Sequence, residues 1–157
     1  MKGMTIIVKT ISGWVKVLII MFGIYITLTG HLSPGGGFAG GVILASAYVL
    51  LMLAFGKEYA EENLPIPLAS KLESVGALLF ALVAIMGAIS SGSFFVNFLQ
   101  HKEAHGQALD LISAGTIPYS NLFIGIKVGA SLFLVILILS SSQYYSPNRP
   151  IDGKEFK

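Results

Sequence analysis

Four long apolar segments constrain what this chain of 157 residues can fold into more than any other feature. They span about residues 5–29, 37–55, 72–93 and 118–141. A helix needs roughly 20 mostly apolar residues to cross the hydrocarbon core of a bilayer, and each segment is close to that length. We therefore predict an all-α integral membrane bundle of four transmembrane helices.

The composition agrees with a membrane protein, because 54% of the residues are hydrophobic and only 11% are charged. A soluble domain carries about 25% charged residues. We expect one transmembrane domain over residues 1–142 and a polar tail over 143–157. The first apolar stretch is long and has no small-residue cleavage site after it, so we expect a first span rather than a cleavable signal.

Several classes of function are excluded or disfavoured by residue content. A net charge of +2 without a basic, aromatic stretch gives no indication of a nucleic-acid partner. The chain has no cysteine, which excludes thiolate zinc and iron–sulfur ligation. His101 and His105 have a spacing that suits a metal site on a helix, but no full ligand set accompanies them. We predict no metal, no cofactor bound by this chain, and no enzyme activity of the chain by itself.

The orientation follows from the distribution of basic residues between the two sides of the membrane. With four spans, the N-terminus, the second connection and the C-terminal tail lie on one side. That side holds Lys2, Lys57, Lys71, Arg149, Lys154 and Lys157. The third connection, on the other side, contributes only Lys102. Basic residues concentrate on the cytoplasmic side, so we expect both termini in the cytoplasm.

Lys127 is the only charged residue between Pro118 and Ser142. A lysine near the centre of a span costs about 2.5–3.5 kcal/mol on insertion scales, so such a residue is a functional-site candidate. Two interpretations stay open: Lys127 takes part in ion movement, or it forms a structural ion pair or carbonyl hydrogen bonds between subunits. The full set of candidates for an ion path or charge relay is Lys127, Lys16, Glu73 and His31.

The fourth segment has two informative faces. Ser120, Lys127 and Ser131 share one stripe, and Gly125 and Gly129 form a GxxxG pair about 200° around the helix from the lysine. Glycine allows a neighbouring backbone to approach closely, whereas lysine needs a polar partner or water. We expect this helix to be contacted on both sides, which favours assembly with other membrane subunits. In the third segment, we expect a small-residue seam to pack tightly. Its members are Ala77, Ala81, Ala84, Ala88 and Ser91.

A glycine-rich string, GHLSPGGGFAGG, covers residues 30–41. Proline suits the first turn of a helix, and the glycines permit unusual backbone angles and close contacts. We predict a tight turn followed by a close helix crossing; a phosphate loop is excluded because no strand precedes the string. The motif for turn and packing consists of Pro34, Gly35, Gly36, Gly37, Phe38, Gly40, Gly41, Gly125 and Gly129. His31, at the mouth of the turn, belongs either to a proton path or simply to the interface. Before the fourth segment, Thr116 is a candidate N-cap.

These strings resemble the MnhB (MrpB) subunit of multisubunit Mrp-type cation/proton antiporters. The run from Gly30 to Gly41 is similar to the family signature, and the SAGTIP segment (113–118) and GIKVGA (125–130) are similar to its fourth-helix region. The sequence of the SAGTIP segment is more similar to the variant found in archaeal membrane-bound hydrogenase and related complexes. By position, Lys127, Pro34 and Phe38 match features of the family.

The resemblance implies a non-catalytic subunit of a complex that exchanges Na⁺ for H⁺, in the cytoplasmic membrane of a prokaryote. In the hydrogenase relatives, redox cofactors lie in other subunits, and the main proton channels belong to larger subunits. A small B-type subunit would form or frame an ion path beside other membrane subunits in the bilayer. The alternatives are a purely architectural subunit that docks larger ones, or a subunit of a stand-alone antiporter.

Overall fold

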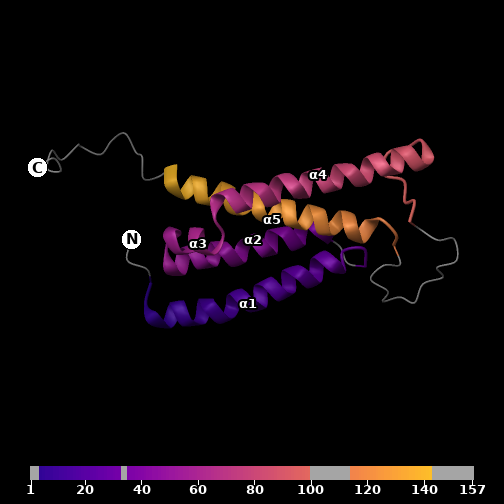
Figure 1. Cartoon of the computed structure of the whole chain (residues 1–157). Coiled ribbons are helices and arrows are strands. Elements are labelled where there is room, and N and C mark those ends of the chain that lie inside the picture. Colours follow the sequence, from indigo (N-terminus) through magenta and orange to yellow (C-terminus); the bar gives the residue numbers. More distant parts are fainter. Residues whose placement is uncertain (1–3, 33–34, 100–113, 143–157) are drawn as a thin grey trace, which may run out of the picture.

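The computed structural model describes residues 4–32, 35–99 and 114–142, and this part of the chain folds into five α-helices (Figure 1). The helices are α1 (Ile6–Leu28), α2 (Gly36–Phe55), α3 (Lys57–Asn63), α4 (Ile66–Ser91) and α5 (Ile117–Ser142). Four of them, all except α3, are long and apolar enough to cross a membrane. The predicted all-α membrane bundle is confirmed. Pro34, the His101–His105 segment and the tail from 143 on lie outside the described residues.

The four long helices lie side by side in the order α1, α2, α5, α4, so that α5 is packed between α2 and α4 (Figure 1). The start of α1, the short helix α3 and the end of α5 are at one end of the bundle (Figure 1). The end of α4 and the start of α5 are at the other end (Figure 1). The start of the first span and the end of the fourth span are therefore on the same side of the bundle, as an even number of spans requires.

The polar connection between the second and third spans contains structure that the sequence patterns did not predict. Gly56 has a φ of +103°, which ends α2 and lets the chain turn directly into α3. α4 then begins at Ile66 rather than near residue 72. The early start is possible because Pro67 is in the first turn, where a backbone N–H has no helical partner to lose.

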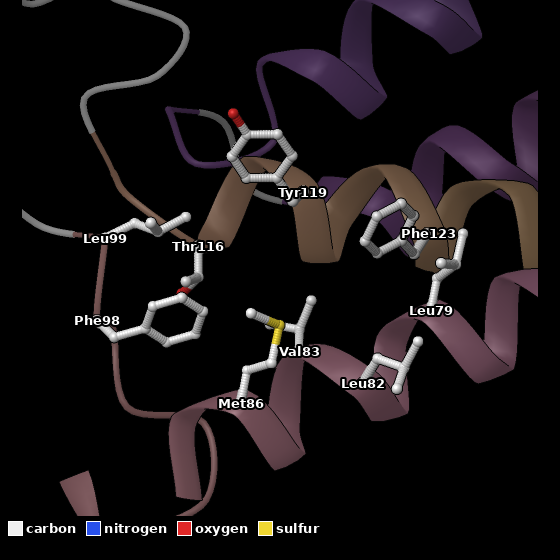
Figure 2. A pocket seen from close by; sticks show the side chains of 9 residues that line it. All are labelled: Leu79, Leu82, Val83, Met86, Phe98, Leu99, Thr116, Tyr119 and Phe123. Carbon is white, nitrogen blue, oxygen red and sulfur yellow. The ribbon is translucent and has the colours of Figure 1, made fainter. Parts of the chain in front are cut away.

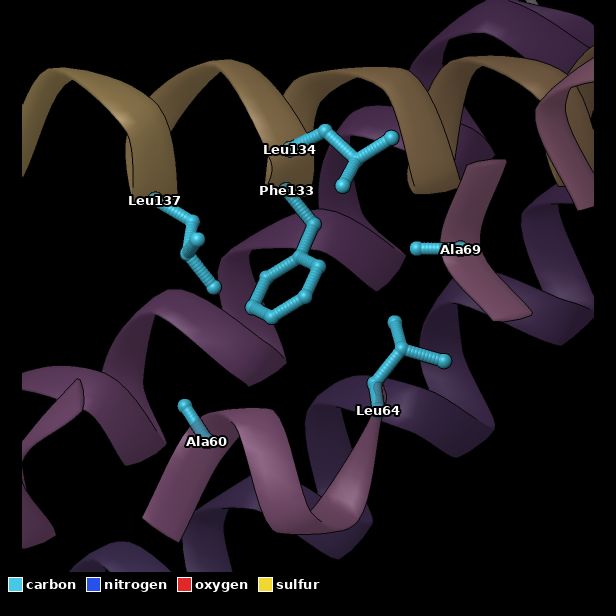
Figure 3. Packing of buried hydrophobic residues seen from close by; sticks show 6 residues of the cluster. All are labelled: Ala60, Leu64, Ala69, Phe133, Leu134 and Leu137. Atoms are coloured by element: carbon cyan, nitrogen blue, oxygen red, sulfur yellow. The ribbon is translucent and has the colours of Figure 1, made fainter. Parts of the chain in front are cut away.

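Buried apolar side chains hold α3, α4 and α5 together at the end of the bundle that carries α3 (Figure 3). Phe133 is 1% exposed and forms the centre, with its ring 5.5 Å from that of Tyr48 on α2. The surrounding buried residues are Ala60, Leu64, Ala69, Leu134 and Leu137. By contrast, Trp14 on α1 is 75% exposed, as expected for a helix face in contact with lipid or with another membrane protein.

Candidate functional site

The glycine-rich string forms the turn and the close crossing that its sequence predicts. Gly35 and Gly36 have φ values of +128° and +50°, which side chains with a Cβ rarely adopt. At Gly37, a Cβ would overlap the backbone carbonyl oxygen of Asn121 on α5. The N–H of Gly37 donates to Asn121 Oδ1 at 3.3 Å. The first turn of α2 therefore lies directly against the backbone of α5.

One turn further along α2, three helices meet. Thr27 of α1 is 3% exposed, and its hydroxyl occupies the place that a Cβ on Gly40 would take. A Cβ on Gly41 would be 2.8 Å from the carbonyl oxygen of Gly125 on α5, and one on Gly129 would be 3.3 Å from that of Gly41. The GxxxG pairs in α2 and α5 thus face each other, which confirms the predicted close crossing.

Phe38 points away from this crossing and is 63% exposed. Asn121 packs against Gly37 at this crossing, and it is not among the residues of the predicted motif for turn and packing. An asparagine inside an apolar span is costly unless its amide is hydrogen-bonded, and this cost was the available signal. Here its oxygen accepts from Gly37, one of the N-terminal N–H groups of α2 that have no partner within their own helix.

Lys127 lies on the opposite side of α5, against α4. Its Cβ would be 2.9 Å from a Cβ placed on Gly76, so the absence of a side chain at Gly76 makes room for the lysine stem. The predicted contact on both sides of this helix is confirmed, but the chain's own α2 and α4 supply it. The close packing of α4 uses only part of the expected seam, since Ala84 is buried as predicted but the other buried small residues are not seam members. Ala77 and Ala81 are exposed, whereas Ala69, Gly76, Ala84 and Gly87 are buried.

The structure brings only one other predicted charge near Lys127. Glu73 is three residues before Gly76 on α4, about 4.5 Å along the helix axis. Within the described residues, the one ion pair joins Lys57 to Glu61 at 3.3 Å, so Lys127 and Glu73 have no ion-pair partner there. Lys16 on α1 is on a helix that does not border α4. His31 is half-buried in the turn beyond α1. The four candidates therefore do not form a single cluster.

The segment that leads into α5 is held by a side chain far away in sequence. Asn97 Nδ2 donates to the carbonyl of Ala114 at 2.9 Å, and Asn97 Oδ1 accepts from the N–H of Thr116 at 2.8 Å. Gly115, between them, has a φ of +65° and packs on the same amide. Thr116 is at the N-cap position, but its hydroxyl donates to Asn97 Oδ1 at 3.2 Å. The stretch 114–116 at the entry to α5 is thus fixed by Asn97.

An apolar pocket of about 350 Å³ opens between α4 and α5 near this segment (Figure 2). Leu79, Val83 and Met86 of α4 face Tyr119 and Phe123 of α5 across it (Figure 2). Its walls contain almost no polar surface, and no cluster of metal-ligating residues occurs in the described ranges. The charged side chains that the structure places inside the spans, Lys127 among them, are therefore separate from this apolar pocket.

Comparison with known proteins decides the family. Residues 7–134 match the model of a domain related to the MnhB subunit of Na⁺/H⁺ antiporters. This chain belongs to the MnhB family. The match begins in α1 and extends to the buried cluster of α5, and it includes the glycine crossing and Lys127.

Relatives of this MnhB-family chain occur in bacteria and archaea. A protein of Staphylococcus haemolyticus named as antiporter subunit mnhB2 is 35% identical over 145 residues, which cover 91% of this chain and 99% of the relative. An uncharacterized protein of Methanocaldococcus jannaschii is 36% identical over 145 residues, or 87% of this chain. The chain spans about half, 52%, of the length of that archaeal relative.

A solved structure has the same fold. It is a chain of the membrane-bound sulfane sulfur reductase, described as an archaeal respiratory membrane complex. The TM-score is 0.72 at 28% sequence identity, over 88% of this MnhB-family chain and 61% of the other. The structural similarity is thus to a chain of a sulfur-reducing complex, whereas the SAGTIP sequence resembles the hydrogenase-type variant.

Proposed function

We propose that this chain is a non-catalytic membrane subunit of a multisubunit Na⁺/H⁺ antiporter module that helps to form or frame the path of the ions. The observation that carries the proposal is the family match over residues 7–134, which includes a lysine inside a span. In this role the chain binds no cofactor of its own. Its partners are other membrane subunits in the lipid bilayer, and the transported ions are Na⁺ and H⁺.

Lys127 is the residue through which this chain would act on the ions. A fixed ammonium inside a bilayer shifts the electrostatic potential along nearby proton or cation routes, because the low dielectric constant screens it little. Glu73, on the adjacent helix, adds a group that can exchange a proton. Lys16, on α1, and His31, in the turn after α1, are at positions separate from Lys127 and would act there.

We place the module in the cytoplasmic membrane of a prokaryote, within a redox-driven respiratory complex. The likeness to a chain of an archaeal respiratory complex supports this setting, and the SAGTIP variant supports a hydrogenase-type member of that class. The relatives named as antiporter subunits support a stand-alone antiporter as the alternative. The proteins that co-purify in mild detergent separate these settings: nickel and iron–sulfur subunits indicate the redox complex, and antiporter subunits alone indicate the other.

A purely architectural role is the second candidate, and the glycine crossing favours it. The backbones of α2 and α5 are in close contact at Gly37, Gly41 and Gly125. This contact gives a rigid unit that is suited to docking larger subunits. Under this role, Gly37→Leu would dissolve the complex and Lys127→Met would be silent. Under a role in the ion path, Lys127→Met would impair exchange in a complex that still assembles.

The experiment that tests the proposal is removal and return of this chain. Everted membrane vesicles carry a pH gradient that collapses when Na⁺ is added and an antiporter is present, and a pH-sensitive dye reports the collapse. We expect vesicles without the chain to lose the Na⁺-dependent collapse, and expression of the chain in trans to restore it. Undiminished collapse without the chain would contradict the proposed function.

A further inference from the structure

The helices α4 and α5 run antiparallel, so that they present two flanks on either side of their line of contact. Residues 69, 76 and 83 of α4 are level with about 133, 127 and 119 of α5, as the buried cluster, the Gly76 contact and the pocket show. The apolar pocket is on one flank. The other, which we name the lysine flank, consists of Glu73 and Ala77 on α4 and Lys127, Ser131 and Ile138 on α5.

The assignment to one flank follows from the helical period. At about 100° per residue, Ser131 and Ile138 are about 40° and 20° around α5 from Lys127. On α4, Glu73 and Ala77 are about 60° and 100° from Gly76 in the same sense. In an antiparallel pair, equal senses of rotation lead to the same flank. The pocket residues Leu79 and Phe123 are rotated the other way, which agrees with their place in Figure 2.

The lysine flank is open toward the membrane. Ile138 is 61% exposed, Ala77 is exposed, and Lys127 and Ser131 are half-buried at its edge. Lys127 is ten residues into α5, about 15 Å along the axis at 1.5 Å per residue, which is half the hydrocarbon thickness. A lysine at that depth is too far from either interface for its ammonium to reach the headgroups easily.

Within the described residues, nothing compensates this charge. Lys127 has neither an ion pair nor a hydrogen bond through its side chain. Glu73 is on the same flank, but side chains in helices point back toward the N-terminus of their own helix. Since α4 and α5 are antiparallel, the two charged groups diverge along the axis. The flank thus presents a positive group and, about one turn away, a negative one, each directed away from the other.

We infer that the lysine flank receives a membrane-spanning helix of a different subunit, and that this helix carries an Asp or Glu at the level of Lys127. A carboxylate is the group that compensates an intramembrane ammonium, whereas lipid tails offer no counter-charge. The small side chain of Ala77 lets the incoming helix approach closely. The inference rests on the proposed function, because it needs a multisubunit complex, and it adds the face and the chemistry of the contact.

A photo-crosslinking amino acid at Ala77, in the complete complex and in native membranes, tests which molecule covers the flank. The matched control position is Leu78, which is exposed on α4 but directed away from α5. We expect Ala77 to crosslink to another membrane subunit several-fold more strongly than Leu78 does, through a span that contains Asp or Glu. Crosslinks to lipid alone, to a second copy of this chain, or equally from both positions would overturn the inference.

Charge neutralisation tests the pairing itself. Lys127→Met should lower the Ala77 crosslink several-fold, and Lys127→Arg should preserve it. Changing the partner's carboxylate to the amide in the Lys127→Met background should restore it, because removal of both charges leaves neither one uncompensated. An Ala77 crosslink that is indifferent to Lys127→Met would contradict the pairing. If removal of the chain abolishes exchange but Ala77 meets only lipid, the proposed function stands and this inference fails.

Discussion

Asn121 of α5 accepts a hydrogen bond from the backbone N–H of Gly37 at the start of α2, with 3.3 Å between nitrogen and oxygen. The bond caps an N-terminal group of one span with a side chain from another. Such groups have no helical partner and are costly to leave unsatisfied where water is scarce. The pair explains why a glycine run and an asparagine 84 positions apart belong to one structural unit.

The first prediction concerns this contact. Gly37→Ala places a Cβ on the backbone of Asn121, and we expect destabilisation by about 1–3 kcal/mol, as for other overpacked sites. Gly13→Ala is the matched control, because nothing lies within 4 Å of its Cβ position in the middle of α1. That change should be neutral or stabilise by about 0.5–1 kcal/mol. Thermal unfolding in detergent measures both, and equal effects would contradict the crossing.

The second prediction concerns the entry to α5. Asn97→Ala removes hydrogen bonds to Ala114 and Thr116, and we expect a loss of about 1–3 kcal/mol. Asn63→Ala is the control, since Asn63 is exposed and bonds only within its own helix, so its effect should stay within about 0.5 kcal/mol. In a double-mutant cycle, Asn97→Ala and Thr116→Val should be non-additive. Additive losses would show that the two side chains act independently.

The third prediction concerns orientation. The native chain has no cysteine, so single introduced cysteines report topology without a background. Glu62 on α3 and Ser93 after α4 are exposed at opposite ends of the bundle. From the excess of basic residues on the α3 side, we expect Ser93→Cys to react with an impermeant maleimide in intact cells, and Glu62→Cys only after permeabilisation. The reverse pattern would invert the predicted topology.

The sequence was sufficient for the four spans and for the close crossing, because both depend on local patterns. Runs of apolar residues indicate spans, and GxxxG pairs indicate where backbones approach. The sequence was not sufficient to predict which element packs against each face of a helix. Contacts on both faces of α5 were expected to favour other subunits, whereas α2 and α4 of the same chain supply them and Gly76 accommodates the stem of Lys127. A single glycine in α4 was less conspicuous than the regular alanine seam, of which Ala77 and Ala81 are exposed.

Contacts that join distant segments were also beyond the sequence patterns. Asn97 and Thr116 are near the two ends of the connection between α4 and α5, 19 residues apart, and neither residue's surroundings indicate the other. The short helix α3 was missed because its polar sequence lacks an apolar period long enough to recognise. It forms because Gly56 turns the chain at a positive φ and Ala60 and Leu64 are buried against α5.

The measurement that tests the central claim most directly is Na⁺-dependent collapse of a pH gradient in everted vesicles that contain Lys127→Met. Co-purification first establishes that the complex is assembled, and Lys71→Met, an exposed lysine outside the core of the bundle, is the matched control. We predict that Lys127→Met lowers the rate of exchange about tenfold, equivalent to ~1.4 kcal/mol, while Lys71→Met leaves it unchanged. Wild-type exchange by an assembled Lys127→Met complex would contradict a role for this chain in the ion path.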